Sequence, residues 1–284
     1  FGIATDLRFL IALQERGVEV IEDWSHSFLQ GLPPRLPGSS GDYRICSFWK
    51  LVPCVVGGGL WRRNGIGSSR LPRPAPPMRE RAVRLKGMLE AALNQSHYQL
   101  AKTLFAKLEA MRLAFRRPVV VAELAADSTP PPGESHYPFD LQLAKCRMPA
   151  LARRILESCD FAAIAAKRSD NFNHFGRLLA DSEQVHILFR QVPKGTCPWV
   201  FPLLLQQRSE IDHRWRAAGV ALHTFGIYLH SALFRDTDAA TVADAVYLSE
   251  HLLCLAVHQD VSSEQIESSA DTVNRYLATH RTNA

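Results

Sequence analysis

The chain has 284 residues, 46% of them hydrophobic and 21% charged, a balance typical of globular proteins that excludes intrinsic disorder. A chain of this length can hold two domains of ordinary size. Its 33 basic and 28 acidic residues give a net charge of +5, but no zinc-finger or RNP spacing accompanies the basic residues, so we do not expect nucleic-acid binding.

Six cysteines are spread along the chain, without a CxxC pair and without histidines at zinc-finger spacing. This distribution is typical of reduced, buried thiols in a cytoplasmic protein, and it indicates no metal site. No apolar run reaches the ~18–20 residues of a membrane span, and the first residues lack the order of a signal peptide. Because the chain begins at Phe1-Gly2 rather than at a methionine, we expect it to be part of a larger protein.

The first elements predict a parallel sheet. Thr5 or Asp6 can cap a helix that ends before Gly17, and a buried strand follows at once. This order is half of a βαβ unit, in which the strands run parallel. A third strand returns antiparallel after a loop. The three expected strands are Val18–Ile21, Tyr43–Phe48 and Gly59–Arg62.

Proline and glycine divide the middle of the chain. Residues 29–41 predict a surface crossing, and Arg63–Pro77 cannot form regular structure and marks the end of the sheet layer. One or two amphipathic helices are expected between Arg79 and Arg116, followed by a proline-rich loop at 127–138.

The last part of the chain predicts a smaller α/β domain with two or three strands. A long helix is expected at 150–179, with Lys167-Arg168 on its polar side, and Ser262 and Gln265 form a capping box for the last helix, which ends near Leu277. The other predicted elements are a helix at 208–218, ended by Gly219, and strands at 185–191, 199–205, 220–225 and 252–257. The domains expected from these patterns are residues 1–77, 78–149 and 150–284.

Two charged residues follow neighbouring strands of the first sheet. Asp23 comes after the first strand and Lys50 after the second, so both are expected at the carboxyl edge, where open α/β sheets bind ligands. A lysine amine can form a Schiff base with the aldehyde of pyridoxal phosphate, and a carboxylate can keep the pyridine nitrogen protonated. The Ser47 hydroxyl could donate to the phosphate, and Gly57–Gly59 would let backbone pass close to the site.

These residues resemble a known family. The run Val20–Ser27, followed by Gly41-Asp42, Ser47-Phe48, Lys50 and Gly57–Gly59, is similar to the core of the DegT/StrS-type sugar aminotransferases. Phe1-Gly2 and Leu252–Ser262 resemble the start and the late strand-to-helix signature of that core. The resemblance implies the pyridoxal phosphate-dependent transferase fold type I. The chain would then hold an incomplete three-layer α/β/α large domain and a smaller α/β C-terminal domain.

The resemblance also implies site roles. Lys50 would be the Schiff-base lysine, Asp23 the partner of the pyridine nitrogen, His26 a neighbour of the cofactor ring and Ser47 a phosphate ligand. Arg147 resembles an arginine in a segment that reaches into the neighbouring subunit's site, where it would contact substrate.

Ordinary structural roles are also open for some of these residues. His26 could be a core histidine and Arg147 a solvated surface arginine, while His258 and Gln259 are expected to serve packing and capping.

Two departures from the family pattern are visible. Only Trp49 separates Ser47-Phe48 from the lysine, where members commonly have three residues, and Lys145 replaces the asparagine usual two positions before the arginine. They favour an alternative reading, a non-catalytic or regulatory homologue that acts as a dimerising scaffold. The family's dehydratases replace the lysine by histidine, so Lys50 argues against that reaction. A Ser-His-Asp hydrolase is disfavoured because no G-x-S-x-G elbow exists.

The leading hypothesis is therefore an aminotransferase. The resemblance implies transfer of an amino group from an amino acid, glutamate in the family, to a keto sugar that is nucleotide-linked, by a cytoplasmic homodimer. The family's phosphate loop and several sheet strands precede the position of Phe1, so we expect the chain by itself to bind cofactor poorly.

Overall fold

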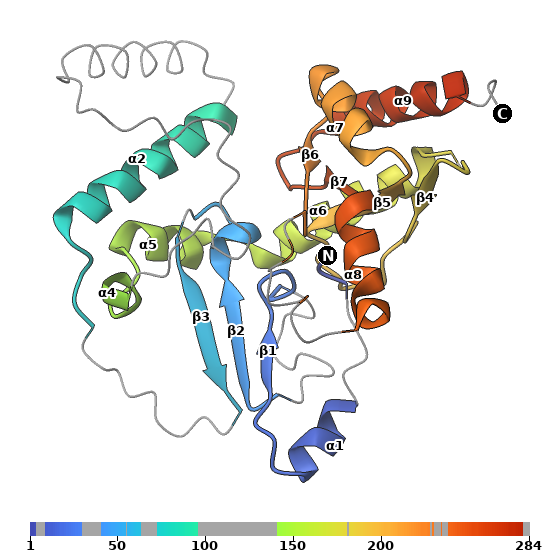
Figure 1. The fold of residues 1–284 in the computed structure, drawn as a ribbon. Coiled ribbons are helices and arrows are strands. Elements are labelled where there is room, and N and C mark those ends of the chain that lie inside the picture. The colour runs from blue at the N-terminus through green and yellow to red at the C-terminus, as the bar shows by residue number, and fades with distance from the viewer. Residues whose placement is uncertain are drawn as a thin grey trace, which may run out of the picture.

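The structure, a computed structural model, describes residues 1–3, 9–29, 41–54, 56–63, 73–95, 141–180, 182–227, 229, 234 and 238–280. In this part the chain forms two sheets with helices packed against them (Figure 1). The expected crossing at 30–40, the helix beyond Gln95 and the loop at 127–138 lie outside the described residues.

The first sheet has the order β1-β2-β3. β1 (Ile21–Asp23) pairs parallel with β2 (Tyr43–Ser47), and β3 (Gly58–Arg62) returns antiparallel, which confirms both predicted directions. A short helix, α1 (Phe9–Glu15), precedes β1. The first strand lies three residues later than predicted. It also has only one buried face, since Glu22 is buried while Ile21 and Asp23 are exposed.

The two faces of the first sheet differ. One face packs against α5 (Ala150–Ser158), seen behind the strands in Figure 1, and its core includes Cys46, Leu51, Cys54, Ala152 and Cys197. Because side chains alternate along a strand, the cross-strand row Asp23–Ile45–Leu60 lies on the other face. There Ile45 and Leu60 are 40% and 67% exposed. Asp23 therefore stands on an open, apolar sheet face.

The prediction of one continuous helix over residues 150–179 is wrong, because the structure has two helices there. α5 ends at Ser158 and α6 (Phe161–Leu178) begins after Asp160, whose extended backbone breaks the helix and whose carboxylate accepts a hydrogen bond from the Ala163 amide. The expectation that Arg168 lies on the polar side is also wrong, because this residue is 1% exposed. Before α5 lie α2 (Met78–Gln95) and α4 (Leu141–Ala144).

Each of the four predicted strand ranges contains a strand of the second sheet, so within the described chain the sheet has four strands rather than two or three. Within the described residues it has four antiparallel strands in the order β4-β5-β7-β6, which are Val185–Ile187, Val200–Leu205, Leu252–Ala256 and Leu222–His223. β4 and β6 are shorter than predicted. The helices packed with it are α7 (Arg208–Ala217), α8 (Ala239–His251), which was not predicted, and α9 (Ser263–His280).

The capping box of α9 is confirmed. The Ser262 amide donates to Gln265 Oε1 over 2.8 Å, and the Gln265 amide donates to Ser262 Oγ over 3.2 Å. The second core gathers Phe172, Phe201 and Trp215 around the sheet. None of the helices in the described ranges is both long and apolar enough to cross a membrane.

The two cores do not divide at residue 150. Ala152, Ile155 and Phe161 pack into the core of the first sheet, although they follow the expected boundary. The division into 1–77, 78–149 and 150–284 stays a prediction.

Two helical glycines give opposite predictions for stability. A Cβ on Gly176 in α6 would lie 1.7 Å from the carbonyl oxygen of Arg190, whereas a Cβ on Gly87 in α2 would meet nothing within 4 Å. Gly176→Ala is expected to lower the free energy of unfolding by about 1–3 kcal/mol, because the backbone must move. Gly87→Ala should raise it by about 0.5–1 kcal/mol through helix propensity. Urea unfolding measures both, and a Gly176→Ala protein as stable as the parent would contradict this packing.

Candidate active site

The amine predicted to be reactive lies where the two sheets meet. Lys50 ends the short 3-10 helix η1 (Phe48–Lys50) directly after β2, and its Nζ lies 2.9 Å from Nε2 of His26. The His26 ring stacks on the indole of Trp199, with centroids 4.1 Å apart and planes 7° apart. Trp199 immediately precedes β5. The contact between Lys50 and His26 is therefore supported from the second sheet.

Burial makes this histidine neutral. Burial, and to a smaller extent the positive charge of Lys50, lowers the pKa of His26 to about 4. A neutral imidazole can accept a hydrogen bond at Nε2, and a lysine ammonium can only donate. The Lys50 amine therefore donates to His26, and the imidazole carries its own proton on Nδ1.

Lys50 itself is made more reactive by its surroundings. Burial lowers the pKa of the amine, and the negative charge of Asp23 partly opposes this effect. A lower pKa increases the fraction of free amine, which is the nucleophilic form.

Asp23 provides the negative charge of the site. Its Oδ1 accepts a hydrogen bond of 2.8 Å from the Ser25 amide. Burial raises the pKa of Asp23, but the hydrogen bonds from Ser25 and the positive charge of Lys50 outweigh it, so the pKa lies below its ordinary value. Asp23 is thus a carboxylate at neutral pH. The parallel register of β1 and β2 places it at the same sheet edge as Lys50.

Ser47 lies at this edge too. It is the last residue of β2, on the same face as Asp23 by strand alternation, and its hydroxyl makes no capping bond to η1. The structure therefore brings together four of the predicted site residues, Asp23, His26, Ser47 and Lys50.

Arg147 lies apart from these residues. It is exposed in the loop before α5, where its amide donates to the Pro74 carbonyl. It lines a cavity of about 530 Å³ together with Arg73 and Arg84, and none of the four residues at the sheet edge lines that cavity.

The glycine run serves packing within the chain. A Cβ on Gly58 would lie 2.6 Å from the Cys46 carbonyl oxygen, and one on Gly57 would lie 2.7 Å from the methyl carbon of Met148. The close backbone approach expected of these glycines is therefore made to neighbouring protein atoms.

Sequence reasoning missed the aromatic wall of the site. Phe225 contacts both His26 and Trp199 edge to face, at centroid distances of 5.6 and 5.7 Å. Trp199 and Phe225 had been assigned only to strands. Their apolar runs give no signal that they meet a turn about 170 to 200 residues earlier in the chain.

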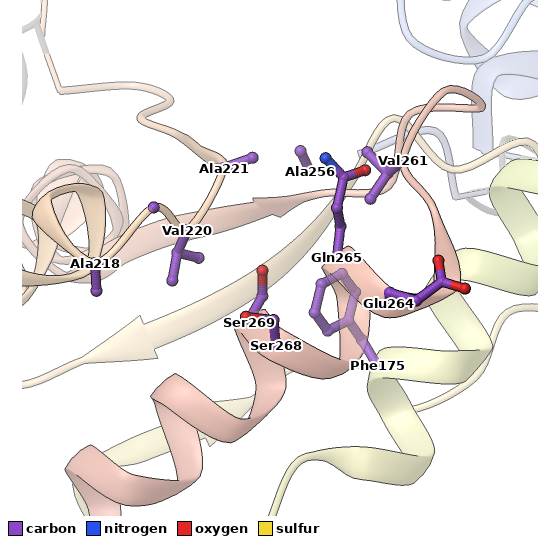
Figure 2. A pocket seen from close by; sticks show the side chains of 11 residues that line it. Phe175, Ala218, Val220, Ala221, Ala256, Val261, Glu264, Gln265, Ser268 and Ser269 are labelled. Atoms are coloured by element: carbon purple, nitrogen blue, oxygen red, sulfur yellow. The ribbon is translucent and has the colours of Figure 1, made fainter. Parts of the chain in front are cut away.

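A second cavity lies away from this site. Its volume is about 240 Å³, and Figure 2 shows it between the segment that carries Val220 and Ala221 and the start of α9, where Glu264 and Ser268 lie. It belongs to the second sheet and none of the predicted site residues lines it. Over the described ranges, no three histidine, cysteine or acidic residues group in a way that could hold a metal ion.

Removing the Lys50 charge should raise the pKa of His26. In Lys50→Ala we expect a value above about 4 but still below the ordinary 6.5, because burial remains. An NMR titration of the imidazole measures it. Lys167→Ala is the control, since the Lys167 charge acts on Glu264 in α9. An unchanged pKa of His26 in Lys50→Ala would contradict the contact between them.

Comparison of the sequence with protein-family models and with curated proteins gives no match. Solved structures do resemble it. One is a DegT DnrJ EryC1 StrS aminotransferase from Brucella abortus, at 15% identity and a TM-score of 0.56, covering 98% of this chain and 62% of that chain. Another is the sugar aminotransferase Spr1654 from Streptococcus pneumoniae in its PLP form, at 14% identity and a TM-score of 0.57, covering 98% and 66%.

A third similar structure is DesI in the presence of its TDP-sugar product, at 16% identity and a TM-score of 0.56, covering 99% of this chain and 63% of that chain. The chain thus spans roughly three fifths to two thirds of the length of these proteins. At such identities the likeness establishes the fold. The chain has the fold of the DegT/DnrJ/EryC1/StrS aminotransferases, the pyridoxal phosphate-dependent transferase fold type I.

Proposed function

We propose that this chain is part of a pyridoxal phosphate-dependent aminotransferase that transfers an amino group from an amino acid, glutamate, to the keto group of a nucleotide-linked sugar. The observation that carries the proposal is the Lys50 amine, 2.9 Å from a neutral His26, at the sheet edge that also holds Asp23. The proposal includes a homodimer in the cytoplasm.

The groups at the sheet edge are chemically suited to the cofactor. Pyridoxal phosphate carries an aldehyde, a pyridine nitrogen and a phosphate, and the site offers an amine, a carboxylate and a hydroxyl from Lys50, Asp23 and Ser47. Asp23 and Ser47 lie on one face of the sheet, so both can contact one ligand there. When bound, the cofactor supplies an electron sink for negative charge on a substrate carbon.

Each side chain then has a defined task. Lys50 would hold the cofactor through its free amine, which the lowered pKa makes more abundant, and its Nζ would carry a proton to and from the reacting carbon. His26 accepts the hydrogen bond from Nζ and so orients the amine. Asp23 is ionised and would hold the pyridine nitrogen, and the Ser47 hydroxyl would hold the phosphate.

The substrate class is supported by charge. Three arginines, Arg73, Arg84 and Arg147, line the cavity of about 530 Å³ together with one carboxylate, Glu80, which pairs with Arg84 over 3.7 Å. The lining keeps an excess of positive charge, and guanidinium groups bind phosphate oxygens in bidentate fashion. This supports an anionic substrate such as a nucleotide-linked sugar. DesI, a protein of the same fold, was solved in the presence of its TDP-sugar product.

A non-catalytic scaffold of the same fold is the rival. The single residue between Ser47-Phe48 and Lys50 favours it, as does Lys145 in place of asparagine. Against it, η1 turns the shortened spacing into one helical turn, from which Nζ still reaches His26. A scaffold would have no need to keep a half-buried amine beside a neutral histidine.

Reductive trapping tests the proposal. The chain is mixed with excess pyridoxal phosphate, reduced with borohydride, digested and analysed by mass spectrometry, a procedure that also detects weak binding. We expect the label on Lys50, its loss in Lys50→Arg and its retention in the matched control Lys167→Arg. A label distributed over surface lysines, and equal in Lys50→Arg, would sink the proposal and favour the scaffold.

A further inference from the structure

An arginine that the proposed chemistry does not use is buried beside the site. Arg168 lies in the middle of α6 and is 1% exposed. Burial lowers its pKa to about 10, which still leaves the guanidinium charged at neutral pH. The negative charge of Asp260 partly opposes this shift, although none of the ion pairs in the described part of the chain includes Arg168. Burying such a charge is unfavourable unless its hydrogen bonds are satisfied, so its contacts need an explanation.

All three nitrogens of this guanidinium donate to neutral oxygens. Nε donates to Gln259 Oε1 over 2.8 Å, in the loop after β7. Nη1 donates to the carbonyl of Pro198 over 3.4 Å and to that of Trp199 over 3.3 Å, just before β5. Nη2 donates to the carbonyl of Lys50 over 3.4 Å. One side chain on α6 therefore contacts three other segments that are distant in sequence.

Two of these segments carry the site. Lys50 supplies the amine, and Trp199 supplies the ring on which His26 stacks. Arg168 thus fixes the backbone from which the amine projects and the backbone from which the supporting indole projects. A lysine at this position could not make the same contacts, because its donors radiate from one atom whereas those of arginine form a planar fork.

We propose that Arg168 is a positioning residue for Lys50, holding the turn that carries the amine in register with Trp199 and Gln259. The inference deepens the proposed function and rests on it, in that it takes Lys50 as the reactive amine. It also assigns Gln259 a task, which is to orient the guanidinium so that Nη2 points at the Lys50 carbonyl.

The test measures the pKa of Lys50 without any cofactor. Competitive labelling with acetic anhydride across a range of pH reports the free-amine fraction of each lysine by mass spectrometry. In Arg168→Lys the charge is kept and the fork is lost, so the Lys50 turn loosens and the amine becomes more solvated. We expect its pKa to rise by about half a unit, an about threefold smaller fraction of free amine at neutral pH. Trapping of pyridoxal phosphate at Lys50 should fall by a similar factor.

Arg177→Lys is the matched control, because Arg177 lies in the last turn of the same helix and is exposed. The free energy of unfolding is measured alongside. A purely structural arginine would lower stability in Arg168→Lys and leave the pKa of Lys50 in the folded protein unchanged, which would overturn the inference.

A second variant covers the case in which Arg168→Lys does not fold. Gln259→Leu removes only the acceptor of Nε, and a smaller rise in the pKa of Lys50 is expected. An unchanged pKa there would equally overturn the inference. Failure of the inference can be told apart from failure of the proposed function. The proposed function fails when the parent chain takes no pyridoxal phosphate at Lys50, whatever pKa the anhydride labelling gives for this lysine.

Discussion

The His26 imidazole contacts the Lys50 amine and stacks on the indole of Trp199, and this pair of contacts joins the two sheets of the molecule. Lys50 follows β2 and His26 follows β1, so the parallel pairing of these strands determines that the two residues meet. The indole of Trp199, at the start of the second sheet, lies flat against the imidazole. Lys50 and His26, at the edge of the first sheet, are therefore partly enclosed by an aromatic side chain from the second.

Burial sets the charges at this site. A charged histidine beside a charged lysine would be unfavourable, and the enclosure by Trp199 and Phe225 resolves this by keeping the imidazole neutral. The amine then retains one partner that accepts its hydrogen bond and one carboxylate, Asp23, that attracts its charge from a more exposed position. Burial still lowers the pKa of the amine below its ordinary value, which favours the free form that covalent chemistry at Lys50 requires.

The sequence was informative where local patterns decide the structure. The two strands ending near Asp23 and Lys50, their parallel direction and the Ser262–Gln265 capping box follow from alternation, helix-strand order and capping chemistry, all of which act over a few residues. The resemblance to the aminotransferase family also rests on short runs of sequence, such as Val20–Ser27 and Gly57–Gly59.

Long-range contacts could not be predicted in this way. Arg168 was expected in solvent because it neighbours Lys167 in a polar stretch, yet acceptors from three distant segments satisfy it in the core. The partners of His26 were missed for the same reason, since a turn after β1 carries no information about an indole near residue 200. The break at Asp160 was missed because apolar residues continue at helical spacing across it, whereas the chain starts a new helix there, capped by the Asp160 carboxylate.

A crystal structure of the chain grown with saturating pyridoxal phosphate tests the central claim most directly. The account predicts continuous electron density from Nζ of Lys50 into one pyridine ring whose nitrogen faces the carboxylate of Asp23, with His26 beside that ring. A ring bound elsewhere, or one joined to Lys50 with its nitrogen turned away from Asp23, would contradict the account.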